Sequence, residues 1–223
     1  MMPSSLRIAV LASGRGSNLA ALMAARDHGE LQVEFALVGS DKAGAGALRL
    51  AEAAGIATLA LDPRGYPDRR AFDLDLFERI TASGAELLVL AGFMRIIHAD
   101  ALTPWIGRMI NIHPSLLPKY RGLHTHRRAL EAGDTEHGAS VHFVTAELDG
   151  GPVIAQARLA IAPEDTEQQL AQRLLPLEHR LLPAVLGLLA SRRLRWDGHG
   201  AQLDGQPLAA PLELGAHGLQ PAA

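Results

Sequence analysis

The sequence predicts an α/β protein: a doubly wound, mostly parallel sheet with helices on both faces and an antiparallel addition near the C-terminus. Short aliphatic segments alternate with helix-like segments up to residue 113, which is typical of parallel sheets. The continuous apolar run at 86–91 suits a central strand buried on both faces. Hydrophobic residues make up 48% of the chain and aromatic residues only 4%, so the core is expected to be aliphatic.

Each element of the first half is bounded by turn residues. A strand at 8–12 stops at Ser13, and a glycine-containing turn leads into a helix from Asn18 to about Asp27. The further elements expected up to residue 113 are a strand at 33–38, a helix at 43–54, a strand at 56–61, a helix at 68–82, and strands at 86–91 and 109–113. Gly55 closes the second helix and Pro114 ends the last strand.

The pattern changes after about residue 137. Strands at 139–144 and 153–161, joined by Asp149-Gly150-Gly151-Pro152, are predicted to form an antiparallel pair. A long helix should follow from Thr166 to about Ala190, interrupted or kinked near Pro176 and Pro183.

The C-terminal segment is expected to be small and irregular. Residues 195–196 and 202–204 suit a terminal hairpin. With no repeat or linker in the sequence, residues 1–210 are interpreted as one domain. Residues 211–223, rich in Gly, Pro, Ala and Leu, are interpreted as a loose tail.

Composition excludes several classes of function. The chain of 223 residues has no cysteine, which rules out disulfides, thiolate catalysis and cysteine-bound zinc or iron–sulfur clusters. The formal net charge of −3 argues against a general nucleic-acid surface. Residues 1–13 do not form a signal peptide, and no apolar run approaches the roughly 18–20 residues that span a bilayer. We expect a soluble, cytoplasmic protein with no membrane or nucleic-acid partner.

The turn Gly14-Arg15-Gly16-Ser17-Asn18 joins the first strand to the first helix. Glycines there let backbone N–H groups turn toward an anion, and the helix N-terminus adds partial positive charge. The segment is not a Walker A loop, and Leu19 replaces the third glycine of a dinucleotide fingerprint. A phosphate site and a plain capped turn are both open interpretations.

Asn111 and His113 leave one face of a predicted strand at its carboxyl end, where open α/β sheets bind ligands. An amide beside an imidazole can hold a developing oxyanion while the imidazole moves protons. Both residues could instead bond the backbone at a strand end. Asp149 could orient His113 and raise its pKa, or could simply be a turn residue before two glycines.

Two other groups carry weaker signals. His124 and His126, with His137 and His142 further along, lack the partner set of a zinc site, so we expect no metal. Lys119, Arg121, Arg127 and Arg128 surround a proline-containing loop and suit either a small anion or a solvated edge. The segment 92–97 suits a groove for a flat heterocycle, or core packing.

These motifs together resemble the folate-dependent phosphoribosylglycinamide formyltransferases. The resemblance is carried by three segments in order: Leu90-Ala91-Gly92-Phe93-Met94-Arg95, Asn111-Ile112-His113-Pro114-Ser115-Leu116-Leu117-Pro118, and His142-Phe143-Val144 followed by Leu148-Asp149-Gly150-Gly151-Pro152. It covers roughly residues 7–205. The chain departs from the family pattern at Arg121, where proline is common.

The resemblance implies roles by position. Asn111, His113 and Asp149 match the catalytic residues, Gly16, Ser17 and Asn18 match the segment that holds the ribonucleotide phosphate, and Glu178 matches an acid near the substrate amine. The positions that match folate contacts are Arg69, Met94, Arg95, Ile96, Ile97 and Asn111.

The implied reaction is formyl transfer from 10-formyltetrahydrofolate to the amine of 5-phosphoribosylglycinamide in purine biosynthesis. The amine attacks the formyl carbon directly, so no enzyme nucleophile is needed. Protonated His113 and Asn111 would hold the oxyanion. The alternatives are a deformylase or methionyl-tRNA formyltransferase of the same fold, and a non-catalytic nucleotide-binding module.

Overall fold

The computed structural model describes residues 5–222. The chain forms two compact parts, one ending at Asn111 and the other beginning at Ile112. The division falls inside strand β5 (Met109–His113), which therefore belongs partly to each.

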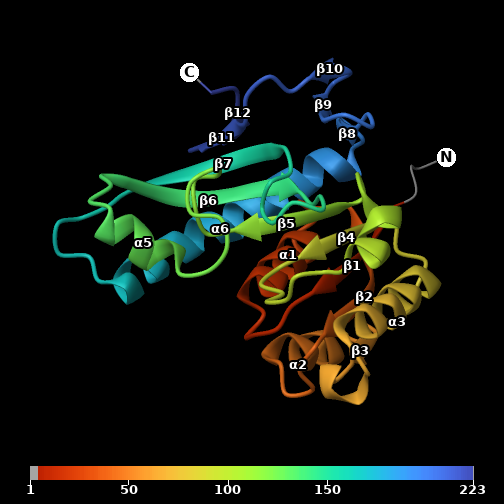
Figure 1. Ribbon diagram of the computed structural model, residues 1–223. Coiled ribbons are helices and arrows are strands. Elements are labelled where there is room, and N and C mark those ends of the chain that lie inside the picture. Colours follow the sequence, from red (N-terminus) through yellow and green to blue (C-terminus); the bar gives the residue numbers. More distant parts are fainter. Residues whose placement is uncertain (1–4, 223) are drawn as a thin grey trace. The chain divides into compact units, whose positions relative to one another are not determined.

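The first part is built on a parallel sheet. Its strands are β1 (Leu6–Leu11), β2 (Val33–Ser40), β3 (Thr58–Ala60), β4 (Leu87–Leu90) and the start of β5, in the order β5-β4-β1-β2-β3. All four pairings are parallel, and Figure 1 shows β1 and β4 at the middle. The chain leaves β1 on one side toward β2 and β3, and places β4 and β5 on the other. This reversal is the position where open α/β sheets form a crevice at their carboxyl ends.

Helices connect these strands: α1 (Ser17–Asp27), α2 (Gly46–Ala53), α3 (Arg69–Ala82) and the short α4 (Ala99–Leu102), with single 3₁₀ turns at Pro63–Gly65 and Thr103–Trp105. Helix α3 begins after Asp68, whose carboxylate accepts the Ala71 N–H at 2.8 Å. Its buried face includes Phe72, Leu76 and Ile80. Burying each such side chain contributes roughly 1.5–3 kcal/mol.

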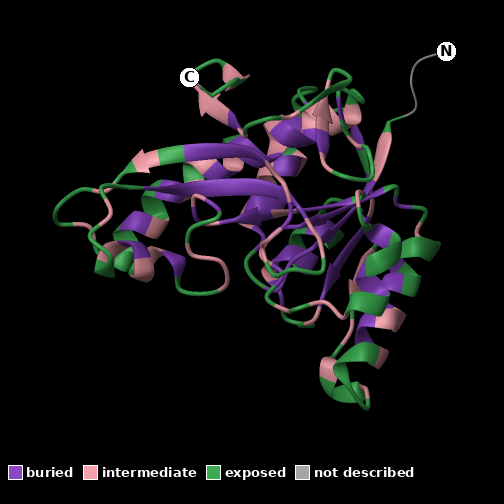
Figure 2. Ribbon diagram, turned by 45° about the horizontal axis from the view of Figure 1, so that its top comes forward, coloured by how far each residue is buried: buried purple, intermediate pink, exposed green. Residues whose placement is uncertain are grey.

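The second part is mainly antiparallel. Strands β6 (Glu136–Phe143) and β7 (Val153–Ala160) form a long antiparallel pair, and Figure 2 colours nearly all of β6 and half of β7 as buried. Two helices, α5 (Thr125–Glu131) and α6 (Glu167–Ala190), complete this part, and α6 packs against β6 and β7. Strands β8 (Leu194–Trp196), β9 (Ala201–Leu203) and β10 (Gln206–Pro207) form a small antiparallel sheet, in agreement with the predicted terminal hairpin.

Of the two alternatives predicted for helix α6 near its prolines, an interruption or a kink, the interruption is wrong. The helix runs unbroken from Glu167 to Ala190 with Pro176 and Pro183 inside it. A proline in a helix interior costs about 3 kcal/mol. The side chains that the helix fully buries, Leu170, Leu174, Leu181, Leu182, Val185 and Leu186, can outweigh that cost, since each contributes roughly 1.5–3 kcal/mol. A capping box between Thr166 and Gln169 fixes the start of the helix.

The expectation of a loose tail is also wrong. Strand β11 (Leu212–Gly215) pairs with β7 in parallel, and β12 (Gly218–Gln220) folds back on β11. Leu212 is buried, and Glu213 accepts a hydrogen bond from Arg158 at 2.9 Å. The tail covers an edge of β7 that would otherwise present unpaired N–H and C=O groups.

The predicted fold class is confirmed: a mostly parallel sheet with helices and an antiparallel C-terminal addition. The core is aliphatic, as the composition indicated, with Ile8, Val10, Leu88 and Ile110 all fully buried. Within residues 5–222, no helix combines the length and apolarity needed to cross a bilayer.

Candidate active site

The glycine turn after β1 shapes the N-terminus of α1. Gly16 is the N-cap residue, with φ of 84°, a left-handed conformation that glycine adopts without cost. A Cβ there would lie 2.8 Å from the Cα of Ala47, so no larger residue fits. Ser17 and Asn18 lie inside the helix rather than at its cap. Because Gly16 has no side chain to cap the helix, the partial positive charge of this N-terminus suits it to binding an anion.

The segment after β4 is anchored to the end of β1. The Ser13 N–H donates to the Gly92 carbonyl at 3.0 Å, and the Met94 N–H donates to the Ser13 hydroxyl at 3.0 Å. Met94 and Ile96 are nevertheless 66% and 56% exposed. A rigid backbone that presents large apolar side chains to solvent is typical of a ligand surface. The alternative that this segment is only core therefore fails for Met94 and Ile96.

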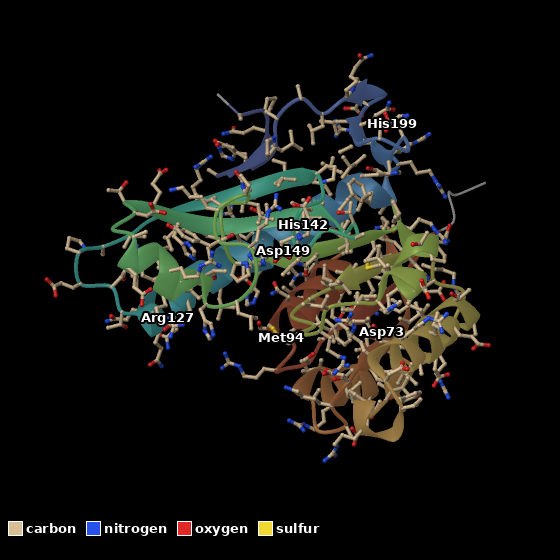
Figure 3. The ribbon with its side chains drawn as sticks, viewed as in Figure 1. Asp73, Met94, Arg127, His142, Asp149 and His199 are labelled. Carbon is tan, nitrogen blue, oxygen red and sulfur yellow. The ribbon has the colours of Figure 1, made fainter. Side chains whose placement is uncertain are left out.

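A buried carboxylate, which sequence analysis missed, supports the same segment. Asp73 on α3 has no exposed surface, and its Oδ2 accepts the His98 N–H at 2.7 Å (Figure 3). Arg95 lies over the Phe72 ring at 4.6 Å. Burial raises the pKa of Asp73, and this effect exceeds the opposing ones of the His98 N–H and of Arg95 and Arg69. An acid on the apolar face of the predicted helix 68–82 was the signal that could have found it.

Strand β5 carries Asn111 and His113 on one face, as predicted. Asn111 is half-buried, and His113 is 6% exposed at the carboxyl end of the strand. The Nε2 of His113 lies 3.0 Å from the Tyr120 carbonyl oxygen. A carbonyl can only accept, so Nε2 carries the proton and donates.

The second part brings Asp149 to His113, although the two are 36 positions apart in the sequence. Asp149 Oδ2 lies 3.5 Å from His113 Nδ1 and accepts the Gly122 N–H at 2.8 Å. Asp149 Oδ1 lies 3.6 Å from His142 Nε2, and Figure 3 shows the His142 and Asp149 side chains close together. Asp149 has φ of 46°, a conformation unusual for a residue with a side chain and often found at functional sites. Asp149 therefore contacts two buried histidines in addition to its place before the two glycines.

Burial sets the charge states of this pair. It lowers the pKa of His113 below its ordinary value, and the Tyr120 carbonyl and Asp149 only partly oppose it. The predicted pKa-raising effect of Asp149 is present, but the loss of water around the ring exceeds it. Burial alone would raise the pKa of Asp149, yet its contacts with His142 and His113 and the Gly122 N–H together lower it. The ligand-free pair is a carboxylate beside a mostly neutral imidazole at pH 7.

His142 is a neighbour of Asp149 that the sequence analysis did not connect with the His113 site. It is 1% exposed on β6, and its Nδ1 lies 2.8 Å from the Phe143 carbonyl, to which it donates. This bond fixes the ring so that Nε2 faces Asp149. A histidine within a buried strand, in the same motif as Asp149, was the available signal.

The other histidines are arranged differently. His126 Nδ1 and His137 Nε2 are 2.9 Å apart, and His124 is exposed with φ of 58° just before α5. Burial lowers the pKa of both paired rings, that of His137 to about 4. Among the described residues, no three His, Cys, Asp or Glu side chains lie close enough to hold a metal ion.

Ion pairs occupy most of the basic cluster. Lys119 pairs with Asp134 at 3.0 Å, Arg127 with Glu131 at 3.8 Å, and Arg121 with Glu147. Glu178, the acid expected near the substrate amine, lies on α6 and is 8% exposed. Arg69 is the first residue of α3.

The first part has a parallel sheet with a helix N-terminus suited to an anion, and the second has a contact between His113 and Asp149. Such features are typical of α/β enzymes. Comparison with known proteins identifies the family. The sequence pattern of the formyl transferase family matches residues 6–186. The chain belongs to the formyl transferases.

Particular relatives are similar over nearly their whole length. Phosphoribosylglycinamide formyltransferase of Escherichia coli K12 is 47% identical over 203 residues, which cover 91% of this chain and 96% of that protein. The enzyme of the same name from Haemophilus influenzae is 39% identical over 91% of this chain and 95% of its own. The solved structure from Coxiella burnetii has a TM-score of 0.88 at 48% identity, covering 92% of this chain and 96% of that one. The resemblance stated from the motifs is confirmed.

Proposed function

We propose that this chain transfers the formyl group of 10-formyltetrahydrofolate to the amine of 5-phosphoribosylglycinamide, in the cytoplasm and on the path to purines. The relatives that carry the name phosphoribosylglycinamide formyltransferase match it over more than nine-tenths of its length. One structural observation carries the mechanism: the buried His113 and the half-buried Asp149 contact each other at the end of the strand that also bears Asn111.

The reaction needs charge stabilisation and proton transfer rather than an enzyme nucleophile. The substrate amine forms a bond to the formyl carbon, and the carbonyl oxygen becomes an oxyanion. The bond from that carbon to N10 of the folate then breaks, and the proton lost by the amine reaches N10. The Asn111 amide, half-buried on β5, can donate to the oxyanion.

His113 is suited to hold the proton in transit. Its Nε2–H is fixed on the Tyr120 carbonyl, so the lone pair of the neutral ring is on Nδ1. A proton accepted there turns the ring into a cation 3.5 Å from the Asp149 carboxylate. This attraction stabilises the ring only while it holds the proton. Catalysis requires such an interaction, which is stronger during the reaction than before it. The lowered pKa of His113 keeps the free ring ready to accept.

Substrate binding is assigned by position. Gly16, Ser17 and Asn18 would hold the ribonucleotide phosphate at the N-terminus of α1. Arg69, Arg95 and Asn111, with the apolar Met94, Ile96 and Ile97, would contact the folate, and Glu178 would lie near the amine. The whole of residues 1–210 would act as one catalytic unit.

The test is formyl transfer between the two small molecules, followed by folate absorbance, with wild type and His113→Ala. Turnover that is lost in the variant supports both the reaction and the site. A reaction that releases formate without the ribonucleotide would instead identify a deformylase. Tight ribonucleotide binding with neither activity would favour a non-catalytic binding module.

A further inference from the structure

The segment Tyr120–Leu123 contacts both members of the buried pair. The Tyr120 carbonyl accepts from His113 Nε2 at 3.0 Å, and the Gly122 N–H donates to Asp149 Oδ2 at 2.8 Å. Only Arg121 separates the two contact residues. A shift of this short backbone segment would therefore change the position of the histidine and of the carboxylate together.

The segment Tyr120–Leu123 has a backbone conformation that residues with side chains rarely adopt without supporting contacts. Tyr120 has φ of 55° and Gly122 of 79°, and His124, which follows directly, has φ of 58°. For residues with a side chain, this left-handed region costs roughly 1–2 kcal/mol each. The segment must be held in place by contacts from outside it.

Arg128 on α5 supplies several of those contacts, and the Tyr120 hydroxyl adds another by donating to Asp134 Oδ2 at 2.8 Å. The Nη1 of Arg128 donates to the Arg121 carbonyl at 2.6 Å and reaches the Leu123 carbonyl at 3.4 Å. Its guanidinium lies over the Tyr120 ring, 5.2 Å from the centroid. A planar guanidinium can donate hydrogen bonds to carbonyls along its edge while its flat face stacks on an aromatic ring. The ammonium group of a lysine has no flat face and no such row of N–H donors. One side chain thus touches three of the four residues of this segment: Tyr120, Arg121 and Leu123.

We propose that Arg128 is a positioning residue for the formyl-transfer reaction: it fixes segment 120–123 so that the Tyr120 carbonyl and the Gly122 N–H hold His113 and Asp149 in register. The proposal rests on the proposed function. It concerns the chemical step, because the contacts of this segment lead to the proton-handling pair.

The Arg121–Glu147 ion pair adds a second, weaker attachment. It joins the middle of the segment to the loop that carries Asp149. The Glu147 side chain is 65% exposed, and exposed pairs contribute about 0–1 kcal/mol. Arg128 is half-buried and makes several contacts, so we expect it to dominate.

The experiment compares Arg128→Lys and Arg128→Gln with Arg127→Lys and Arg127→Gln. Arg127 is the adjacent residue on α5, exposed and paired only with Glu131 among the interactions of the described chain. The lysine variant keeps the positive charge that acts on His113 but loses the planar contacts. We expect both Arg128 variants to lower kcat roughly tenfold or more, since misplacing catalytic groups by about 1 Å can cost 10²-fold. The KM of each substrate should change less than threefold, and both Arg127 variants should match wild type.

A spectroscopic readout tests the positioning directly. The ¹⁵N chemical shift of His113 Nε2 and its N–H signal report the bond to Tyr120 and need no turnover. In Arg128→Lys we expect that signal to move or to exchange with water faster, while circular dichroism and Tm show a folded protein. If the lysine variant fails to fold, the glutamine variant serves as the test. If the glutamine variant fails to fold, the lysine variant serves instead.

Three results would overturn the proposal: a wild-type kcat in both Arg128 variants, a raised KM at unchanged kcat, or an unchanged His113 signal in a folded Arg128 variant. Equal losses in the Arg127 variants would also overturn it, because the effect would then belong to the helix as a whole. If the wild type performs no formyl transfer, the proposed function fails, and the His113 signal still decides whether Arg128 positions the ring.

Discussion

The glycine turn of the first part and the histidine site of the second both lie at strand ends, but the first depends on the backbone and the second on side chains. At Gly16 the determining features are backbone: a left-handed φ and a distance of 2.8 Å that leaves no space for a Cβ. At His113 the determining features are side chains with little exposed surface, joined by contacts from Tyr120, Asp149 and Gly122.

We propose that this difference separates substrate binding from the chemical step. Backbone N–H groups at a helix N-terminus carry fixed partial charges that do not titrate, so they suit a phosphate whose charge stays constant. A buried imidazole beside a carboxylate changes its charge during a reaction, and burial determines when. We therefore expect changes in the first region to alter KM and changes in the second to alter kcat.

The largest effect should come from His113→Ala. Removing the group that holds the proton should lower kcat by roughly 10²–10⁴-fold. Steady-state kinetics and calorimetric binding of the ribonucleotide measure the two quantities separately, and binding should be retained. A variant with normal kcat would show that the histidine site does not carry the chemistry.

Asp149→Asn should have the next largest effect. The amide keeps the shape of the side chain but loses the negative charge that stabilises the His113 cation. Each pKa unit of lost stabilisation corresponds to about tenfold, so we expect kcat to fall about 10- to 100-fold. Ribonucleotide affinity, measured by calorimetry, should change far less. Near-wild-type turnover would contradict the role assigned to Asp149.

Gly16→Ala tests the first region, with Gly14→Ala as its control. The added Cβ at Gly16 meets Ala47 in a backbone conformation that costs about 1–2 kcal/mol for alanine, whereas a Cβ at Gly14 meets no described atom within 4 Å. We expect the KM for the ribonucleotide to rise roughly 5- to 30-fold in the first variant and to stay unchanged in the second. A fall in kcat at constant KM would show that the two regions do not divide binding from chemistry.

The smallest effect concerns the His126–His137 pair, which has no carboxylate in contact with its rings among the described groups. With a folded-state pKa of about 4, His137 stays neutral where the unfolded chain, with its ordinary value of 6.5, takes up a proton. The contribution of His137 to the free energy of unfolding should therefore have its full value above pH 6.5. It should fall on acidification toward pH 4, by at most about 1.4 kcal/mol per pH unit. Urea unfolding at several pH values should show a flatter dependence in His137→Gln. An unchanged slope would show that this buried ring does not control acid stability.

The sequence by itself determined the order of the elements and the positions of the main chemical groups. Alternating aliphatic and helical segments predicted the parallel sheet, and strand β5 has the bounds that Pro114 and the apolar pattern indicated. The spacing of Asn111 and His113 placed both on one face, because side-chain direction along a strand alternates strictly. The motifs around them identified the family that the comparisons confirmed.

Tertiary structure decided what depends on contacts between distant residues. Packing kept α6 continuous through Pro176 and Pro183. The tail forms strand β11 because it can pair with the open edge of β7. The contacts of Asp149 with His113 and His142, and those of Arg128 with Tyr120 and Leu123, join separate elements that no local pattern relates. The lowered pKa of His113 has the same origin, since burial is a property of the folded chain and no residue carries it alone.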